Sequence, residues 1–156
     1  QYQSILHVPF IWSDPAAPAA ASTDAIGSTI DIAATILDRA RIAPYAGMQG
    51  KSLLASMGPD GRPVRDCALV QYEQQMSDKD TDHMPRWHSI VDARYRMTVM
   101  SDSGFGELYD LQNDPGEFDN LWDRPEHAGL KARLIERLLQ LEIEHTDTVP
   151  YPTGRA

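Results

Sequence analysis

The stretch of sequence that decides the fold is residues 106–122, which read Gly106-Glu107-Leu108-Tyr109-Asp110-Leu111-Gln112-Asn113-Asp114-Pro115-Gly116-Glu117-Phe118-Asp119-Asn120-Leu121-Trp122. Its apolar beginning predicts the end of a short strand, and a tight corner follows. Pro115 has the backbone angle that the second position of a turn requires, and Gly116 is expected to take the positive φ of the third position in a type II turn. The side chains of Asn113 and Asp114 are expected to bind nearby backbone N–H groups and hold the corner.

Three further strands are expected before this corner, at residues 67–73, 87–93 and 95–100, from their apolar runs and alternation. Four strands in close succession predict an antiparallel sheet. The apolar face of such a sheet must be covered by another layer. After the corner, the sequence supplies the expected apolar anchors of a covering helix, which are Phe118, Leu121 and Trp122.

A long C-terminal helix is the predicted cover. Asp123 is its expected cap, with Glu126 completing a capping box and Pro125 in the first turn. Its apolar stripe comprises Leu130, Leu134, Leu138 and Leu141, widened by Ile135 and Leu139. The sequence therefore predicts an α+β fold, in which an antiparallel sheet of about four strands is covered by this helix.

The N-terminal part predicts one strand and one helix. Residues Leu6–Trp12 are almost continuously apolar, which is typical of a strand buried on both faces in a larger sheet. Pro9 taken alone favours an edge position. A helix is expected from Asp31 to Ala40, with Ser28 or Asp31 as its cap. An apolar strand of this kind indicates part of a larger fold, and if it were left uncovered it could pair with a second copy of the chain.

Residues 107–122 closely resemble the Glu-Leu-Tyr-Asp-Leu…Asn-Asp-Pro-Gly-Glu…Asn-Leu signature near the C-terminus of the sulfatase family. This family comprises formylglycine-dependent sulfatases and phosphonate monoester hydrolases, within the alkaline phosphatase superfamily. Residues 7–11, 31–38 and 49–54 resemble further segments of the family in the same order. Arg41 stands where the family usually has Gly, so the helix before it is expected to end differently.

The resemblance implies where the chain divides into domains and where the catalytic residues of the family lie. Residues 1–56 would be the end of the larger α/β catalytic domain, and residues 57–156 the C-terminal subdomain. The nucleophile of the family lies in a Cys/Ser-x-Pro/Ala-x-Arg motif, whose first residue becomes formylglycine. The residues after Cys67 do not fit this motif. The catalytic Lys of the family precedes the Tyr that corresponds to Tyr2, so it falls outside this sequence.

The resemblance therefore implies that this chain carries no catalytic residue and no metal ligand of its own. A divalent cation, usually calcium, and formylglycine are implied for the parent protein. The expected partners are the N-terminal part of the parent and, for the parent, a sulfate or phosphonate ester. The chain is expected to complete the fold and to be inactive alone.

The net charge of −9 limits the classes of partner that the chain is expected to bind. It disfavours nucleic acid and anionic membrane surfaces, which require clustered Lys and Arg. Cys67 is the one cysteine of the sequence, so no disulfide within the chain is possible, and its apolar neighbours predict a buried thiol. No secretory signal is visible at the start, and the compartment of the parent stays open between cytoplasm and periplasm.

Four residues of one segment are candidate substrate contacts. His83, Arg86, Trp87 and His88 bring a guanidinium, an aromatic ring and two imidazoles together, and such a set can clamp an anionic or sugar-like group. The alternative is a solvated loop that leads into a strand, with Trp87 packed in the core. His7 is a further candidate, although a lone His at the start of a strand is more often structural.

Three alternatives to the hydrolase interpretation remain: a calcium-binding loop, a small metal-dependent enzyme and a non-catalytic interaction module. Carboxylates in residues 78–82 have the spacing of a calcium loop, but His83 and Ser89 stand where that loop needs Gly and Glu. A small metal-dependent enzyme could use Asp82, His83 and His88. A stand-alone interaction module, with the sheet and helix as an adaptor, would need no catalytic parent.

Overall fold

A computed structural model describes residues 2–15, 22–57, 61–73, 86–101 and 103–146. The chain divides into two compact units, which are considered separately. Unit 1 comprises residues 1–12 and 67–141, and unit 2 comprises residues 13–66 and 142–156. The division at residue 56 that the resemblance implies stays a prediction. No helix in the described part of the chain has the length and apolar composition needed to cross a membrane.

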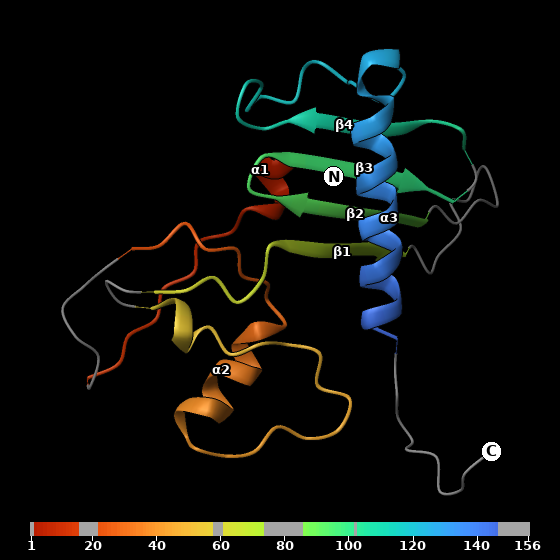
Figure 1. Cartoon of the computed structure of the whole chain (residues 1–156). Helices are drawn as coiled ribbons and strands as arrows, with labels where there is room; N and C mark the ends of the chain where they lie inside the picture. The colour runs from red at the N-terminus through yellow and green to blue at the C-terminus, as the bar shows by residue number, and fades with distance from the viewer. Residues whose placement is uncertain (1, 16–21, 58–60, 74–85, 102, 147–156) are drawn as a thin grey trace, which may run out of the picture. The chain divides into compact units, whose positions relative to one another are not determined.

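Unit 1 is built on the expected four-stranded antiparallel sheet, whose strands lie in the order β1-β2-β3-β4 (Figure 1). The strands are β1 (Cys67–Glu73), β2 (Arg86–Asp92), β3 (Tyr95–Met100) and β4 (Gly106–Asp110). The register places Leu69 opposite Ile90, Ile90 opposite Met97, and Met97 opposite Leu108. Because side chains of a strand alternate between faces, these four residues form one apolar row across the sheet.

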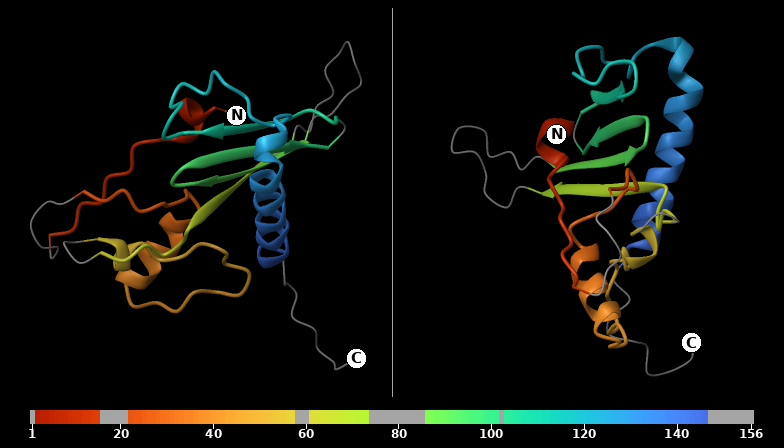
Figure 2. Two further views of the ribbon diagram at one scale, coloured as in Figure 1. Left: turned by 45° about the horizontal axis from the view of Figure 1, so that its top comes forward. Right: turned by 90° about the vertical axis from the view of Figure 1, so that its left-hand side faces the viewer.

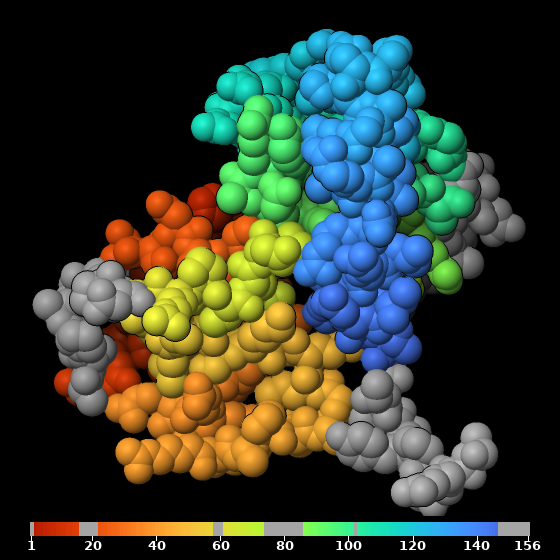
Figure 3. Space-filling model, in the orientation of Figure 1, coloured from red at the N-terminus to blue at the C-terminus, as the bar shows by residue number. Residues whose placement is uncertain are grey.

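Helix α3 (Ala128–Glu144) crosses the face that carries this row, as expected (Figures 2 and 3). Fully burying one large apolar side chain contributes about 1.5–3 kcal/mol, so this layer is the main source of stability in unit 1. The buried core of the layer consists of Cys67, Ile90, Met97, Leu108, Leu121, Leu134, Leu138 and Leu141. The sheet and its helical cover therefore confirm the predicted α+β architecture.

The start of α3 differs from the expectation. The 3₁₀ turn η2 (Pro125–His127) precedes it, and no side chain caps this turn, so the predicted cap by Asp123 is wrong. Pro125 supplies the first position of the turn, where its missing N–H costs nothing. Ile135 and Leu139 are exposed, which also corrects the predicted width of the stripe. The buried residues of α3 are Leu134, Leu138 and Leu141, and Leu130 packs against the same core.

The corner after β4 is closed by a hydrogen bond from the Glu117 N–H to the Asp114 carbonyl, at 3.1 Å. Gly116 does not take the predicted positive φ, and Glu117 takes it instead, at φ 56. The Asp114 carboxylate binds the Asp119 N–H at 2.8 Å, as expected. The Asn113 amide binds the carboxylate of Asp110 at 2.9 Å rather than a backbone N–H group.

The apolar anchors after the corner behave differently from one another. Leu121 is buried in the core, and Trp122 packs against it. Phe118 is 93% exposed, so its predicted role as an anchor is wrong. Its neighbour Glu117 occupies the inward position, because the positive φ turns the glutamate toward the sheet and α1.

The expected strand at Leu6–Trp12 is not formed in the described chain. Helix α1 (Gln3–Leu6) occupies its beginning, and residues 7–14 have no regular secondary structure. A strand needs a neighbour to bind its backbone, and Pro9 removes one of the donors. Helix α1 lies on the face of the sheet opposite to α3 (Figure 2).

Unit 2 contains helix α2 (Asp31–Arg39), as predicted, and the 3₁₀ turn η1 (Leu54–Ser56). The helix ends in a Schellman motif, in which the Ile42 N–H binds the Leu37 carbonyl and the Arg41 N–H binds the Asp38 carbonyl, both at 2.9 Å. Arg41 takes the left-handed conformation, at φ 57. The expectation that Arg would change this helix end is therefore wrong.

Replacing Arg41 by Gly should stabilise unit 2. A left-handed conformation costs an L-residue about 1–2 kcal/mol, and glycine removes this strain. The greater conformational entropy of glycine in the unfolded chain offsets about half of the gain, so we expect the free energy of unfolding to rise by about 0.5–1 kcal/mol. Thermal unfolding monitored by circular dichroism measures the change. Arg41→Ala is the control, because it removes the same side chain but keeps the strain. An equal gain in both variants would attribute the effect to the side chain.

Candidate functional site

The structure separates the predicted substrate contacts by the alternation of β2. Arg86 and His88 lie on the face that carries α3, and Trp87 lies on the opposite face. His83, residues 78–82 and their proposed metal contacts lie outside the described residues. The described members of the set therefore do not point into one common space.

Each described member has neighbours on β1. The Trp87 ring stacks on the Tyr72 ring, with centroids 5.0 Å apart. The His88 Nε2 lies 3.8 Å from the Glu73 Oε1, and Arg86 is exposed at the beginning of the strand. An exposed guanidinium and a half-buried imidazole on one face are suited to an anionic group. This role stays a prediction for both residues.

Cys67 and metal ligation can be judged within the described ranges. Cys67 lies at the start of β1 and is buried in the core, as predicted. Burial in an apolar core disfavours the thiolate that a nucleophile requires. Among the residues that the structure describes, no three His, Cys, Asp or Glu side chains gather in a group that could hold a metal ion.

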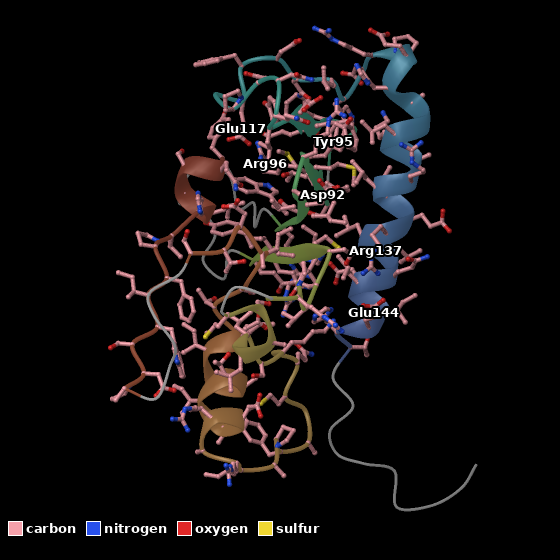
Figure 4. All side chains as sticks on the ribbon, turned by 60° about the vertical axis from the view of Figure 1, so that its left-hand side comes forward. Asp92, Tyr95, Arg96, Glu117, Arg137 and Glu144 are labelled. Atoms are coloured by element: carbon pink, nitrogen blue, oxygen red, sulfur yellow. The ribbon has the colours of Figure 1, made fainter. Side chains whose placement is uncertain are left out.

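The strongest concentration of buried charge lies on the face of the sheet opposite to α3. Arg96 of β3 is fully buried and forms an ion pair with Glu107 of β4, at 2.8 Å. It forms a second ion pair with Glu117 of the following corner (Figure 4). Its Nη1 also donates to the Thr98 hydroxyl at 2.8 Å. We call Arg96, Glu107 and Glu117 the arginine cluster. Two carboxylates offset the cost of burying one guanidinium, and the three groups hold one another in place.

The arginine cluster also holds α1. The Glu117 Oε2 accepts the Gln3 N–H at 2.6 Å, and the Arg96 Cζ lies 5.6 Å from the centre of the Tyr2 ring. The centre of the Tyr109 ring lies 4.8 Å from the same Cζ. Burial, together with the charge of Glu107, raises the pKa of Tyr109. The cluster therefore ties residues 2 and 3 to the sheet through a charge-assisted hydrogen bond and an aromatic contact.

Unit 2 has its own buried acid at the start of α2. Asp31 is fully buried and forms an ion pair with Arg65. Its carboxylate also accepts the N–H groups of Ser28 and Lys51, each at 2.8 Å. The hydrogen bond from the Ser28 N–H satisfies a donor that precedes the helix. The Asp31 side chain therefore stabilises the start of α2 from within its first turn. This geometry is structural: it joins three segments of unit 2 at one carboxylate.

Residues 1–144 match the family model described as N-sulphoglucosamine sulphohydrolase, C-terminal. The chain belongs to this sulfatase family. The finding confirms the resemblance that the corner sequence indicated. In this sulfatase segment, the arginine cluster joins the first residues of the family match to its central sheet.

A curated relative supports the same family. The N-acetylglucosamine-6-O-sulfatase of Bacteroides thetaiotaomicron is 26% identical to this chain over 151 residues, which cover 96% of the chain and 27% of the relative. The sulfatase segment therefore spans about a quarter of the length of that protein. The relative carries most of its length outside the matched part.

Solved structures share the fold. BT4656 in complex with its substrate D-glucosamine-2-N,6-O-disulfate has a TM-score of 0.63 and 24% identity, and covers 82% of this chain and 27% of its own. The phosphonate monoester hydrolase of Agrobacterium radiobacter has a TM-score of 0.64 and 23% identity, with coverage of 82% and 27%. Both show that this sulfatase segment has the fold of the matched part of larger proteins.

Sequence reasoning missed the arginine cluster of the sulfatase segment. The available signal was an arginine within the apolar strand 95–100, where a lone charge on a buried face needs a partner. Glu107 could have been proposed from the pairing of β3 with β4, since it lies opposite Thr98. Glu117 could not, because its position depends on the positive φ that was expected at Gly116.

A surface carboxylate beside the same corner gives a pH-dependent prediction. The hydrogen bonds from Arg94 are the main cause that lowers the pKa of Asp110 to about 2; burial opposes them, and weaker hydrogen bonds from Asn113 add to the lowering. Because the pKa is lowered in the folded state, the stabilisation is present above the ordinary value of 3.8 and is lost as the pH falls toward 2. An NMR titration of the carboxyl carbon should give this pKa.

The variant Arg94→Met should raise the pKa of Asp110 toward 3.8 in the same titration. Arg124→Met is the matched control, because Arg124 is similarly exposed but pairs with Asp119. It should leave the titration of Asp110 unchanged. An Asp110 pKa near 3.8 in the unmodified chain would contradict the interaction.

Proposed function

We propose that this chain is the C-terminal part of a sulfuric ester hydrolase, and that it completes the fold of the parent without activity of its own. The observation that carries the proposal is the family match over residues 1–144. The names of the relatives favour a sulfated amino sugar as the substrate of the parent, since one acts on N-acetylglucosamine 6-O-sulfate and another binds a disulfated glucosamine. A phosphonate ester is the alternative substrate class, because phosphonate monoester hydrolases share the fold equally well.

The chemistry of the parent is expected to come from outside these residues. A formylglycine hydrate would supply the nucleophile, and a divalent cation would stabilise the charge on the ester oxygens. The described residues do not fit the cation, since the buried carboxylates of Glu107 on β4 and of Glu117 in the corner are already bound by Arg96. We therefore assign no catalytic step to this chain, and propose Arg86 and His88, with Trp87 and His83 as further candidates, as contacts to the substrate.

A stand-alone interaction module is the second candidate function. Such a module should cover the apolar segment at residues 6–12 with its own residues. Val8, Phe10 and Ile11 are exposed instead, which favours a larger parent. Two residues of the metal-dependent alternative, Asp82 and His83, lie outside the described ranges, and a metal titration that shows no specific binding would remove it.

Activity assays of two proteins test the proposal. The 156-residue chain and the full-length parent are each incubated with calcium and either an aryl sulfate, a glucosamine 6-sulfate or a phenyl phosphonate ester. We expect turnover by the parent alone. Turnover by the isolated chain would show that the active site has been placed wrongly. A parent that hydrolyses none of the three esters would favour the interaction module.

The proposed substrate contacts are tested in the parent. Arg86→Gln should raise the KM for a sulfated sugar roughly tenfold with little change in kcat, because a contact to the anionic group would be lost from bound substrate and transition state alike. Arg133→Gln is the control, since Arg133 is exposed on α3. Equal kinetics in both variants would remove Arg86 from the substrate site.

A further inference from the structure

The side of α3 that is turned away from the sheet carries large apolar side chains at the surface (Figure 3). Ile135, Leu139 and Ile143 are 42%, 59% and 66% exposed. Their spacing of four residues places them one above the other along the helix, over about 12 Å. We call these three residues the outer ridge. Because α3 already buries its leucines against the sheet, a second apolar line on its outer side indicates a place where another surface docks.

The outer ridge is symmetric about Leu139. Ile135 lies four residues before it and Ile143 four residues after it, within one uninterrupted helix. A second copy of α3 laid antiparallel would place Leu139 opposite Leu139, and Ile135 of each copy opposite Ile143 of the other. This arrangement has a two-fold axis and uses the same patch on both copies, as the commonest interfaces of soluble oligomers do.

The charges beside the outer ridge fit the same antiparallel arrangement. Arg133 and Glu144 are both exposed and lie 11 residues apart, which is close to three helical turns, so they lie on the same side of the ridge. Arg133 precedes Leu139 by six residues, and Glu144 follows it by five. In the antiparallel pair, Arg133 of each copy therefore comes beside Glu144 of the other. A parallel pair would place each charge beside its like, which disfavours that orientation.

We propose that the outer ridge joins two copies of this chain through an antiparallel pair of α3 helices, with Leu139 on the two-fold axis. The inference goes beyond the proposed hydrolase function, because it concerns assembly and needs no residue outside this chain. The sheet-facing side of α3 takes no part in the contact, so each copy keeps its own core.

Disulfide cross-linking under mild oxidation tests the geometry. Leu139→Cys is expected to cross-link to itself, because its two thiols would face each other across the axis. Ile135→Cys and Ile143→Cys are expected to cross-link when the two variants are mixed, but not when either is oxidised alone. Phe118→Cys is the control, since Phe118 is 93% exposed in unit 1 outside α3 and should form no dimer. Cys67 is buried and should contribute little background.

Sedimentation velocity measures the association itself. We expect the 156-residue chain to dimerise, with a Kd that rises by roughly tenfold or more in Leu139→Glu and in Arg133→Glu. The double variant Arg133→Glu with Glu144→Arg should recover the affinity, because the exchanged charges attract again. The three side chains are exposed, so circular dichroism should show an unchanged fold.

Three results would each overturn the proposal. They are a chain that is monomeric at every concentration, self-cross-linking of Ile135→Cys alone, and a dimer whose Kd is unchanged in Leu139→Glu. The same measurement on the full-length parent should also give a dimer. A monomeric parent in which the Leu139→Cys thiol is protected from labelling would show instead that the parent polypeptide covers the outer ridge, and would overturn the proposal as well.

Discussion

Replacing Arg96 by Met should lower the free energy of unfolding of unit 1 by about 3–5 kcal/mol, because removing one member of a buried ion cluster leaves its partners uncompensated. Glu107 and Glu117 would then face each other across the space of the lost guanidinium. The Gln3 N–H would keep its acceptor, but Tyr2 would lose the charge beneath its ring. The loss is therefore expected to reach α1 as well as the sheet.

Urea unfolding followed by tryptophan fluorescence measures this loss, since all three tryptophans, at positions 12, 87 and 122, belong to unit 1. Arg94→Met is the matched control, two positions away in sequence. Arg94 is about half exposed and pairs with Asp110 at the surface, where solvent screens the pair, so its loss should cost much less than the loss of Arg96. Similar losses in the two variants would contradict the importance assigned to the buried cluster.

The second large effect is expected at Asp31. Asp31→Ala would leave the buried Arg65 without its carboxylate, and the N–H groups of Ser28 and Lys51 without their acceptor. Because a buried charge and two donors lose their partner together, we expect unit 2 to be destabilised by about 3–5 kcal/mol. The start of α2 should open first, since the lost hydrogen bonds join it to two other segments.

Hydrogen exchange of the α2 amides, measured by mass spectrometry, reports the opening of this helix directly. Asp38→Ala is the control, since Asp38 is exposed on the same helix. We expect exchange in α2 to accelerate by at least a hundredfold in Asp31→Ala and to change little in Asp38→Ala. Unchanged protection in Asp31→Ala would mean that packing alone holds the helix.

The sequence was sufficient to predict the sheet, its helical cover and α2, because each rests on a local periodicity. Alternation in residues 67–100 and the leucine spacing of α3 are both read from neighbouring positions. The strand expected at Leu6–Trp12 failed for the opposite reason. An apolar run shows that residues will be buried somewhere, but a strand also needs a neighbour, and the described chain provides none there.

The candidate site was also only partly predictable from local sequence patterns. Once β2 is known to begin at Arg86, alternation places Trp87 on the other face from Arg86 and His88. The strand was predicted to begin one residue later, at Trp87, and the residues around its start were predicted to form one cluster. The arginine cluster depends on strand register and on the conformation of Glu117, and neither is encoded in a local pattern.

The central claim is that these residues are the end of a longer sulfatase. The coding sequence upstream of Gln1 tests it most directly. We predict that the reading frame continues for several hundred residues and contains a Cys/Ser-x-Pro/Ala-x-Arg motif. A start codon shortly before Gln1, or a long upstream frame without that motif, would contradict the account.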